Sequence, residues 1–182
     1  MKRAGCVQIE YGFESGSQRV LDKLNKKTTV EQNYRAARMT KQAGIRFLAN
    51  MILGTIEETE QDIKESMKFL RAVKPNHISV YKLIPLPATK VFEELESKKM
   101  ILTDWDIYIN DNTDQNFTNI SSSKLRNMLN AIQTNIVMPN NNVNYIRYNL
   151  FRTIKALRLL ASILLKHPKR LYGIYRYWTD GK

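Results

Sequence analysis

The feature that most constrains this chain is the alternation of strand-like and helix-like patterns along residues 1–102. Residues 6–14, 47–53 and 77–83 are apolar or alternating runs typical of strands, and a helical pattern follows each of them, at 18–24 with 28–44, at 55–73 and at 91–100. A strand–helix unit takes about 30 residues, and successive units give parallel strands with right-handed crossovers. The sequence therefore predicts an α/β fold with about three parallel strands, too few to close a barrel.

The first strand has one apolar and one polar face. Val7, Ile9, Tyr11 and Phe13 alternate with a set that includes Gln8, Glu10, Gly12 and Glu14. Two helix starts are predicted from capping-box spacing, one at Thr28 with Glu31 and one at Thr55 with Glu58.

Beyond the alternating region, residues 103–120 form a polar, Asp- and Asn-rich linker, and residues 121–182 form a basic helical extension. The extension is predicted to contain a helix at 121–137 and, after Pro139 and an asparagine run, a mainly helical segment at 145–178 broken near Pro168 and Gly173. It holds 11 of the 29 lysines and arginines and a single acid, Asp180. Because the net charge of +12 is concentrated there, we expect any anionic partner to bind the extension.

Cys6 is the only cysteine of the chain. An internal disulfide is therefore impossible, and we expect the protein to reside in the reducing cytoplasm. We expect Cys6 itself to be a small, buried residue of a strand. Clusters and thiolate metal sites need several cysteines at defined spacing, so Cys6 alone cannot hold one.

Three polar or glycine-containing turns follow the three predicted strands: Gly12–Ser17, Leu53–Thr59 and Ile84–Thr89. In parallel strand–helix folds, ligands bind at the carboxyl ends of the strands. Glu14 continues the polar face of its strand, and a carboxylate at that position can accept hydrogen bonds from ligand hydroxyls. We therefore expect a binding site built from these turns.

In this order and spacing, the turns and their surroundings resemble the radical S-adenosylmethionine (SAM) superfamily, and most closely its large cobalamin-dependent group. The matching runs are Ala4–Cys6, Gly12–Ser17, Val20–Leu21, Leu24–Lys26, Thr28–Glu31, Lys41–Ile45, Met51–Gly54, Glu58–Asp62 and Pro85–Thr89. The resemblance implies that residues 1–102 are the C-terminal half of a partial, TIM-like (β/α) barrel.

The resemblance also implies roles for individual residues. Glu14 would receive the ribose hydroxyls of SAM, assisted by Ser15, and Lys26 would meet the methionyl carboxylate. The alternative for Lys26 is a solvated lysine at a helix end. The backbone of Ile52 and Gly54 and the loop containing Ile84 and Leu86 would border the adenine.

The chain departs from the family in several motifs. The family's Gly-x-Pro-Gly-Glu-Thr is replaced by Gly54–Thr59, and Pro-x-Pro-Gly-Thr is replaced by Pro85–Thr89, so that a positive φ at Ala88 would be strained. The three-cysteine cluster motif and the glycine-rich third-strand motif are absent. We therefore expect this chain to be inactive alone and to need a missing N-terminal half-barrel or a split partner chain.

In such a complete protein, the resemblance implies a 4Fe-4S cluster, reductive cleavage of SAM to the deoxyadenosyl radical and, in an N-terminal domain, cobalamin. This chain would bind neither the cluster nor cobalamin. Methyl transfer or a radical oxidation or rearrangement would be the reaction.

The basic extension leaves three roles open: packing on the barrel, docking of 145–178 on an anionic membrane surface, or gripping RNA phosphates, the least favoured. Membrane docking would make the protein peripheral to the inner face of the membrane. An alternative to a fragment of an enzyme is a non-catalytic binding module anchored by its extension, and a third hypothesis is a nucleic-acid-modifying relative.

Overall fold

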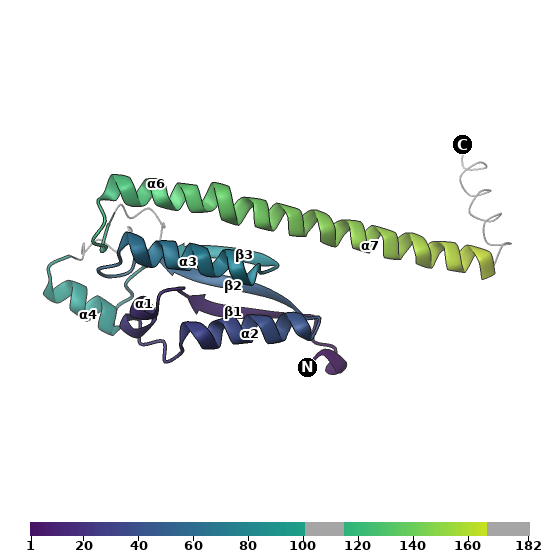
Figure 1. Ribbon diagram of the computed structural model, residues 1–182, viewed down its shortest axis with the longest axis horizontal. Helices are drawn as coiled ribbons and strands as arrows, with labels where there is room; N and C mark the ends of the chain where they lie inside the picture. Colours follow the sequence, from purple (N-terminus) through teal and green to yellow (C-terminus); the bar gives the residue numbers. More distant parts are fainter. Residues whose placement is uncertain (101–114, 167–182) are drawn as a thin grey trace. The chain divides into compact units, whose positions relative to one another are not determined.

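The computed structural model in Figure 1 describes residues 1–100 and 115–166. Its elements are η1 (Lys2–Ala4), β1 (Gln8–Glu14), α1 (Gln18–Lys23), α2 (Val30–Gln42), β2 (Arg46–Leu53), α3 (Glu60–Val73), β3 (His77–Lys82), α4 (Lys90–Ser97), α6 (Ser122–Ile132), the π-helical η2 (Gln133–Val137) and α7 (Met138–Lys166). The predicted alternation is confirmed. Most of the predicted linker and the expected breaks near Pro168 and Gly173 lie outside the described residues.

The strands form one parallel sheet in the order β1-β2-β3. In its register Gly12 lies opposite Asn50, and Asn50 lies opposite Ser79. Burial alternates residue by residue along β2, because helices cover one face of the sheet and leave the other more accessible. This is the predicted α/β class, and an open parallel sheet of this kind is consistent with part of a barrel.

The main core lies between the covered face of the sheet and helices α2 and α3. Phe13 and Phe69 meet edge to face with ring centroids 5.1 Å apart, and Phe47 lies 6.2 Å from Phe13 in a similar geometry. The same core includes Leu125 and Ile132 of α6. The helix after the linker therefore packs with the sheet, through apolar side chains that the extension carries at helical spacing.

Helices α2 and α3 both begin at capping boxes, but not at the predicted residues. The N-cap of α2 is Thr29, whose hydroxyl accepts a hydrogen bond from the Gln32 amide while the Gln32 side chain accepts one from the Thr29 amide. The N-cap of α3 is Thr59, paired with Asp62. The predicted capping boxes at Thr28 and Thr55 are therefore wrong. The same four-residue spacing recurs nearby, and which threonine becomes the N-cap depends on where the helix begins in the fold.

A side chain covers part of the edge of the sheet that β3 forms. Asn141, in the first turn of α7, accepts a hydrogen bond from the Ile78 amide at 2.8 Å and donates one to the Ile78 carbonyl at 2.9 Å. The pair satisfies two backbone groups that another strand would otherwise bind. The predicted interruption at Pro139 does not occur. Helix α6, the π-helical η2 and α7 follow one another directly, and the π-helical turn lies immediately before the proline.

The described chain divides into two compact units, Met1–Asn141 and the segment from Asn142 onward. The sheet, α1 to α6 and η2 belong to the first unit, whereas most of α7 belongs to the second. No helix in the described ranges is long and apolar enough to cross a membrane.

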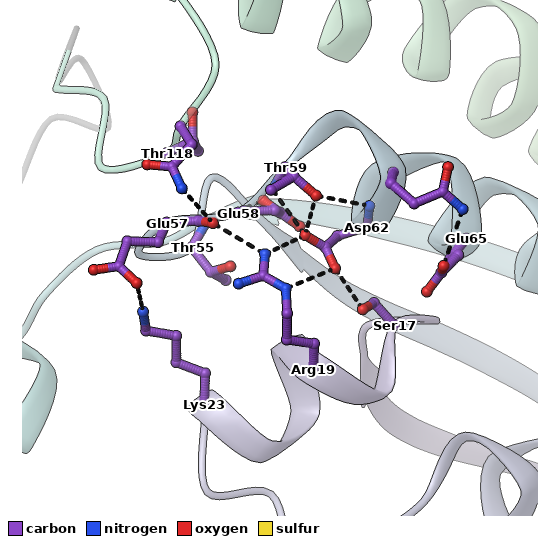
Figure 2. Close-up of polar contacts among 12 residues, drawn as sticks. Ser17, Arg19, Lys23, Thr55, Glu57, Glu58, Thr59, Asp62, Glu65 and Thr118 are labelled. Carbon is purple, nitrogen blue, oxygen red and sulfur yellow. Dashed lines mark hydrogen bonds and ion pairs between the residues drawn. The ribbon is translucent and has the colours of Figure 1, made fainter.

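A carboxylate ties the turn after β1 to the start of α3 (Figure 2). Asp62 accepts hydrogen bonds from the Ser17 hydroxyl at 2.6 Å, from the amide and hydroxyl of Thr59, and from the Arg19 guanidinium, with which it also forms an ion pair. Arg19 also donates to the Glu57 carbonyl at 3.0 Å. One buried acid therefore joins α1, the turn before α3 and α3 itself.

The close approach of these segments also explains a glycine. A Cβ at Gly16 would lie 2.7 Å from the Glu65 carbonyl oxygen and from the Cα of Ser66, both in the backbone of α3. No side chain fits at that separation, so the turn Ser15–Ser17 packs directly on the helix.

Two turns contain a strained residue where the family has glycine. Glu57, in the turn before α3, has φ +56°, and Ala88, in the turn after β3, has φ +61°. The strain foreseen at Ala88 is thus present. Glu57 forms exposed ion pairs with Lys23 and Lys98, and the Lys23 hydrogen bond is the main reason that its pKa falls to about 2. Ala88 has no side-chain functional group that could do the same.

Replacing Asp62 should weaken the fold. In Asp62→Asn, the donors from Ser17, Arg19 and Thr59 lose a charged acceptor, and we expect the free energy of unfolding to fall by about 2–3 kcal/mol. Burial opposes ionisation of Asp62, but its hydrogen bonds from Arg19, Ser17 and Thr59 outweigh burial and hold the pKa below its usual range. The stabilisation is therefore present above the ordinary aspartate pKa and is lost as pH falls, so urea titrations of wild type and variant should converge below about pH 4. Asp22→Asn, at an exposed acid of α1, is the control and should change little.

Replacing Ala88 by glycine should strengthen the fold. A left-handed backbone costs a non-glycine residue about 1 kcal/mol or more, and Ala88 is exposed, so its methyl group contributes little packing. We expect Ala88→Gly to raise the free energy of unfolding by about 1 kcal/mol. Ala36→Gly, inside α2, should lower it by a similar amount. A destabilised Ala88→Gly variant would show that the turn is not under strain.

Candidate functional site

The carboxylate of Glu14 lies on the face of the sheet that α2 and α3 leave uncovered. The strand pairing shifts register between Gly12 and Glu14, and Glu14 itself has φ +62°, a conformation that few glutamates adopt. A Cβ built on Gly12 would lie 2.4 Å from Glu14 Oε1, so the carboxylate folds back directly over the glycine. Phe13, between them, points into the core. Strain of this kind is concentrated at binding and catalytic sites.

Lys26 shares this position with Glu14. Its Nζ donates to Glu14 Oε1 at 2.8 Å and lies 3.3 Å from the Cβ position on Gly12. Helix α1 ends in a left-handed residue, Asn25, and the Lys26 amide bonds the Leu21 carbonyl, which is the geometry of a Schellman cap. The cap turns the chain back and brings a lysine twelve residues after Glu14 to the same spot.

The pair retains access to solvent. The side chain of Glu14 is 18% exposed and that of Lys26 is 33% exposed, so neither is sealed in the core. Of the ligand residues expected from the sequence, these two are the pair that the structure joins by a hydrogen bond. A partly exposed carboxylate and an ammonium beside it can together hold a ligand that carries hydroxyls and a negative group.

Ser15 is oriented differently from what its expected role requires. It is fully buried; its hydroxyl contacts the Ser66 hydroxyl at 3.0 Å and accepts from the Ser17 amide at 3.1 Å. Ser66 belongs to α3, so the Ser15 hydroxyl lies on the covered side of the sheet. Here Ser15 acts as a link between the turn and the helix, and its assistance to a ribose stays a prediction.

The turn after β2 is organised by a buried carboxylate that the sequence reasoning assigned to a cap. Glu58 Oε2 accepts hydrogen bonds from the Gly54 amide at 2.6 Å and from the Thr55 amide at 3.1 Å, while Glu58 Oε1 has no partner among the described residues. Gly54 has φ +78°, which a glycine adopts without strain. Burial, opposed by these two amides, raises the pKa of Glu58 to about 7. The carboxyl group therefore shapes the turn and can carry a proton near neutral pH.

Residues 117–119 bind the same turn through backbone hydrogen bonds. The Glu57 amide donates to the Phe117 carbonyl at 2.8 Å, and the Asn119 amide donates to the Glu58 carbonyl at 3.0 Å. Phe117 also joins a second small core with Ile56, Leu83 and Leu95. The sequence of this segment shows only a polar composition, from which its contact with the turn at residues 57 and 58 could not be predicted.

The remaining expected ligand residues are Ile52, Gly54, Ile84 and Leu86. Ile52 is half-buried and packs against this second core, Gly54 begins the turn, and Ile84 follows β3. Leu86 is 58% exposed, so its side chain is accessible to a ligand or a partner. All four lie at or beyond the carboxyl ends of β2 and β3, as the motif order predicted.

The described residues do not form a metal centre by themselves. No group of three histidines, cysteines or acids gathers within 1–100 and 115–166. Cys6 is partly exposed just before β1 rather than a buried strand residue, and its sulfur contacts the Gln8 carbonyl at 3.6 Å. The expectation of burial was wrong, because β1 begins only at Gln8.

Sequence reasoning missed the acids that organise the turns. Asp62 and Glu58 were placed in a helix pattern and a capping box, and Arg19 was assigned no role. The spacing of Thr59 and Asp62 is itself a capping-box pattern and would have identified one of them. The contact between Arg19 and Asp62 spans 43 residues and has no local signal.

Comparison with known proteins identifies the motif-bearing region. Residues 1–70 match the family model described as the radical SAM superfamily. The anaerobic magnesium-protoporphyrin IX monomethyl ester cyclase of Rubrivivax gelatinosus is 35% identical over 97 residues, covering 53% of this chain and 18% of the cyclase. An uncharacterized methyltransferase of Pyrococcus horikoshii is 28% identical over 109 residues, covering 59% of this chain and 24% of that protein.

A third relative, the tRNA-2-methylthio-N(6)-dimethylallyladenosine synthase of Ehrlichia canis, is 32% identical over 102 residues, covering 51% of this chain and 23% of the synthase. The chain thus spans roughly a fifth of the length of the curated relatives it matches, 18% and 24% for the first two. The matched region contains β1, its Glu14 and the turn before α3, which are the elements on which the resemblance rested. Residues 1–70 of this chain are thus similar to the radical SAM superfamily.

Proposed function

We propose that residues 1–102 are the second half of a radical SAM barrel and supply the ribose, carboxylate and adenine side of the SAM site. The observation that supports this most directly is the Glu14 carboxylate, held over Gly12 on the uncovered face at the carboxyl end of a parallel strand. Ligands of parallel strand–helix folds bind at this end. Residue 12 must be a glycine because the Glu14 carboxylate occupies the space that a side chain at residue 12 would fill.

Each residue of the pair has a defined task in this proposal. Glu14 accepts hydrogen bonds from the ribose hydroxyls through the oxygen that Lys26 does not bind. Lys26 either meets the methionyl carboxylate directly or positions Glu14 through their 2.8 Å hydrogen bond. The turn at Gly54, shaped by Glu58, and the loop through Ile84 and Leu86 border the adenine.

The iron–sulfur cluster is assigned to another part of the protein. Full-length members of the superfamily use SAM with a 4Fe-4S cluster, which supplies the electron for cleavage of the sulfonium. One cysteine in the whole chain does not fit the thiolate requirement of such a cluster. We infer that a further half-barrel, on the same chain or on a partner, provides it and pairs with the edge of β1 that no described strand covers.

The parent activity is proposed as methyl transfer or radical oxidation. The relatives include a cyclase and a methyltransferase by name. The proposed parent is a methyltransferase or radical oxidoreductase of the cobalamin-dependent type, with cobalamin held outside this chain.

Nucleotide binding by the full chain tests the proposal. We expect saturation-transfer NMR to detect weak binding of SAM and of adenosine, because half of a site retains some contacts. In Glu14→Gln both ligands should bind roughly tenfold more weakly or worse, since a hydrogen bond to a charged group is lost. Glu10→Gln, a neighbouring carboxylate on the same face that accepts from Asn50, is the matched control and should bind like wild type.

The same experiment separates the two roles of Lys26. If Lys26 meets the methionyl carboxylate, Lys26→Met weakens SAM binding and leaves adenosine binding unchanged, since adenosine has no such group. If Lys26 only positions Glu14, both ligands lose affinity together. Equal effects of Glu14→Gln and Glu10→Gln, or no nucleotide signal with wild type, would leave the non-catalytic module as the better description.

A further inference from the structure

Helix α7 carries an exposed apolar stripe that no described residue covers. Val143, Ile146, Leu150, Ile154 and Leu157 recur every three or four residues and therefore lie along one side of the helix. Their exposed fractions are 46%, 63%, 59%, 41% and 59%, respectively. A run of aliphatic side chains this accessible marks an interaction surface.

The charge of the same helix restricts the partner. Within α7 there are five basic residues and no acid, and the acid-free stretch extends back to residue 115. Arg152 and Lys155 fall on the side of the helix opposite the stripe, whereas Arg147 and Arg158 flank the stripe along one border. The partner must present an apolar medium next to negative charge.

We propose that α7 lies in the interface of an anionic lipid bilayer, with the Val143–Leu157 stripe in the acyl boundary and the basic side chains at the headgroups. Tyr148 lies on the same side as Arg152, and the Arg152 guanidinium lies 5.5 Å from the centroid of its ring. In this orientation the amphipathic pair would face the headgroups. Basic residues at intervals of three to five along Arg147–Arg158 exclude a spanning orientation.

Two other partners fit less well. A nucleic acid would neutralise the basic residues but would leave the aliphatic stripe in water. A second copy of α7 would cover the stripe but would bring further positive charge against Arg147–Arg158 with no acid to pair. The bilayer is the partner that satisfies both sides of the helix, and this inference is independent of the nucleotide site.

The test is co-sedimentation of the full chain with vesicles of phosphatidylcholine alone or with a third of the lipid replaced by phosphatidylserine. We expect binding to the anionic vesicles at low salt, weakening as salt rises. Arg152→Gln with Lys155→Gln should lower the affinity roughly 25-fold, about fivefold for each charge. Leu150→Asn with Ile154→Asn should abolish binding, whereas Leu150→Ile with Ile154→Leu keeps the apolar area and should bind like wild type.

Circular dichroism on each variant serves as the control for helix content. In a variant with unchanged helix content, a loss of binding is caused by the changed surface of α7. The proposal is overturned if wild type fails to sediment with anionic vesicles at low salt, or if the Leu150→Asn, Ile154→Asn variant still does so. It is also overturned if RNA, but not lipid, binds with affinity that depends on Arg152 and Lys155, or if ultracentrifugation shows a dimer lost in the same asparagine variant.

Discussion

The arrangement of the first unit depends on how closely the turn after β1 approaches the start of α3. At Gly16 the two backbones meet with no room for a side chain, and the Asp62 carboxylate then binds the Ser17 hydroxyl and the Arg19 guanidinium across the same junction. Because the turn also carries Glu14 at its beginning, this junction sets where the candidate ligand carboxylate lies. A shift of α3 would therefore move Glu14, because only Ser15 separates Glu14 from Gly16, the residue that packs on α3.

The glycines of the turn serve different purposes. Gly16 admits a helix backbone, whereas Gly12 makes room for the Glu14 carboxylate on the opposite face of the sheet. Gly54 supplies a left-handed conformation to the next turn. Glu57 and Ala88, which stand where the motifs named above have glycine, also adopt left-handed backbone, and there the conformation is strained.

The two units of the chain present different chemistry. The first has nearly balanced charge, polar turns at the carboxyl end of its strands and a core formed by both sequence-adjacent and distant segments. The second is an acid-free helix through Lys166 that exposes aliphatic side chains. Such a division is consistent with one unit for ligand contact and another for attachment, which are tasks with opposite requirements for solvent and charge.

The sequence by itself determined the parallel α/β order, the likeness to the radical SAM superfamily and the position of Glu14 on the polar face, because strand alternation, helix periodicity and turn motifs are local signals. Only the tertiary structure decided that Lys26 binds Glu14, that Ser15 faces α3, that Thr29 and Thr59 are the N-caps, and that Asn141 covers the edge of β3. The pairs Asn141–Ile78 and Arg19–Asp62 join residues 63 and 43 positions apart, and the choice between neighbouring caps depends on where a helix packs. Such contacts follow from packing, for which no short stretch of sequence carries the information.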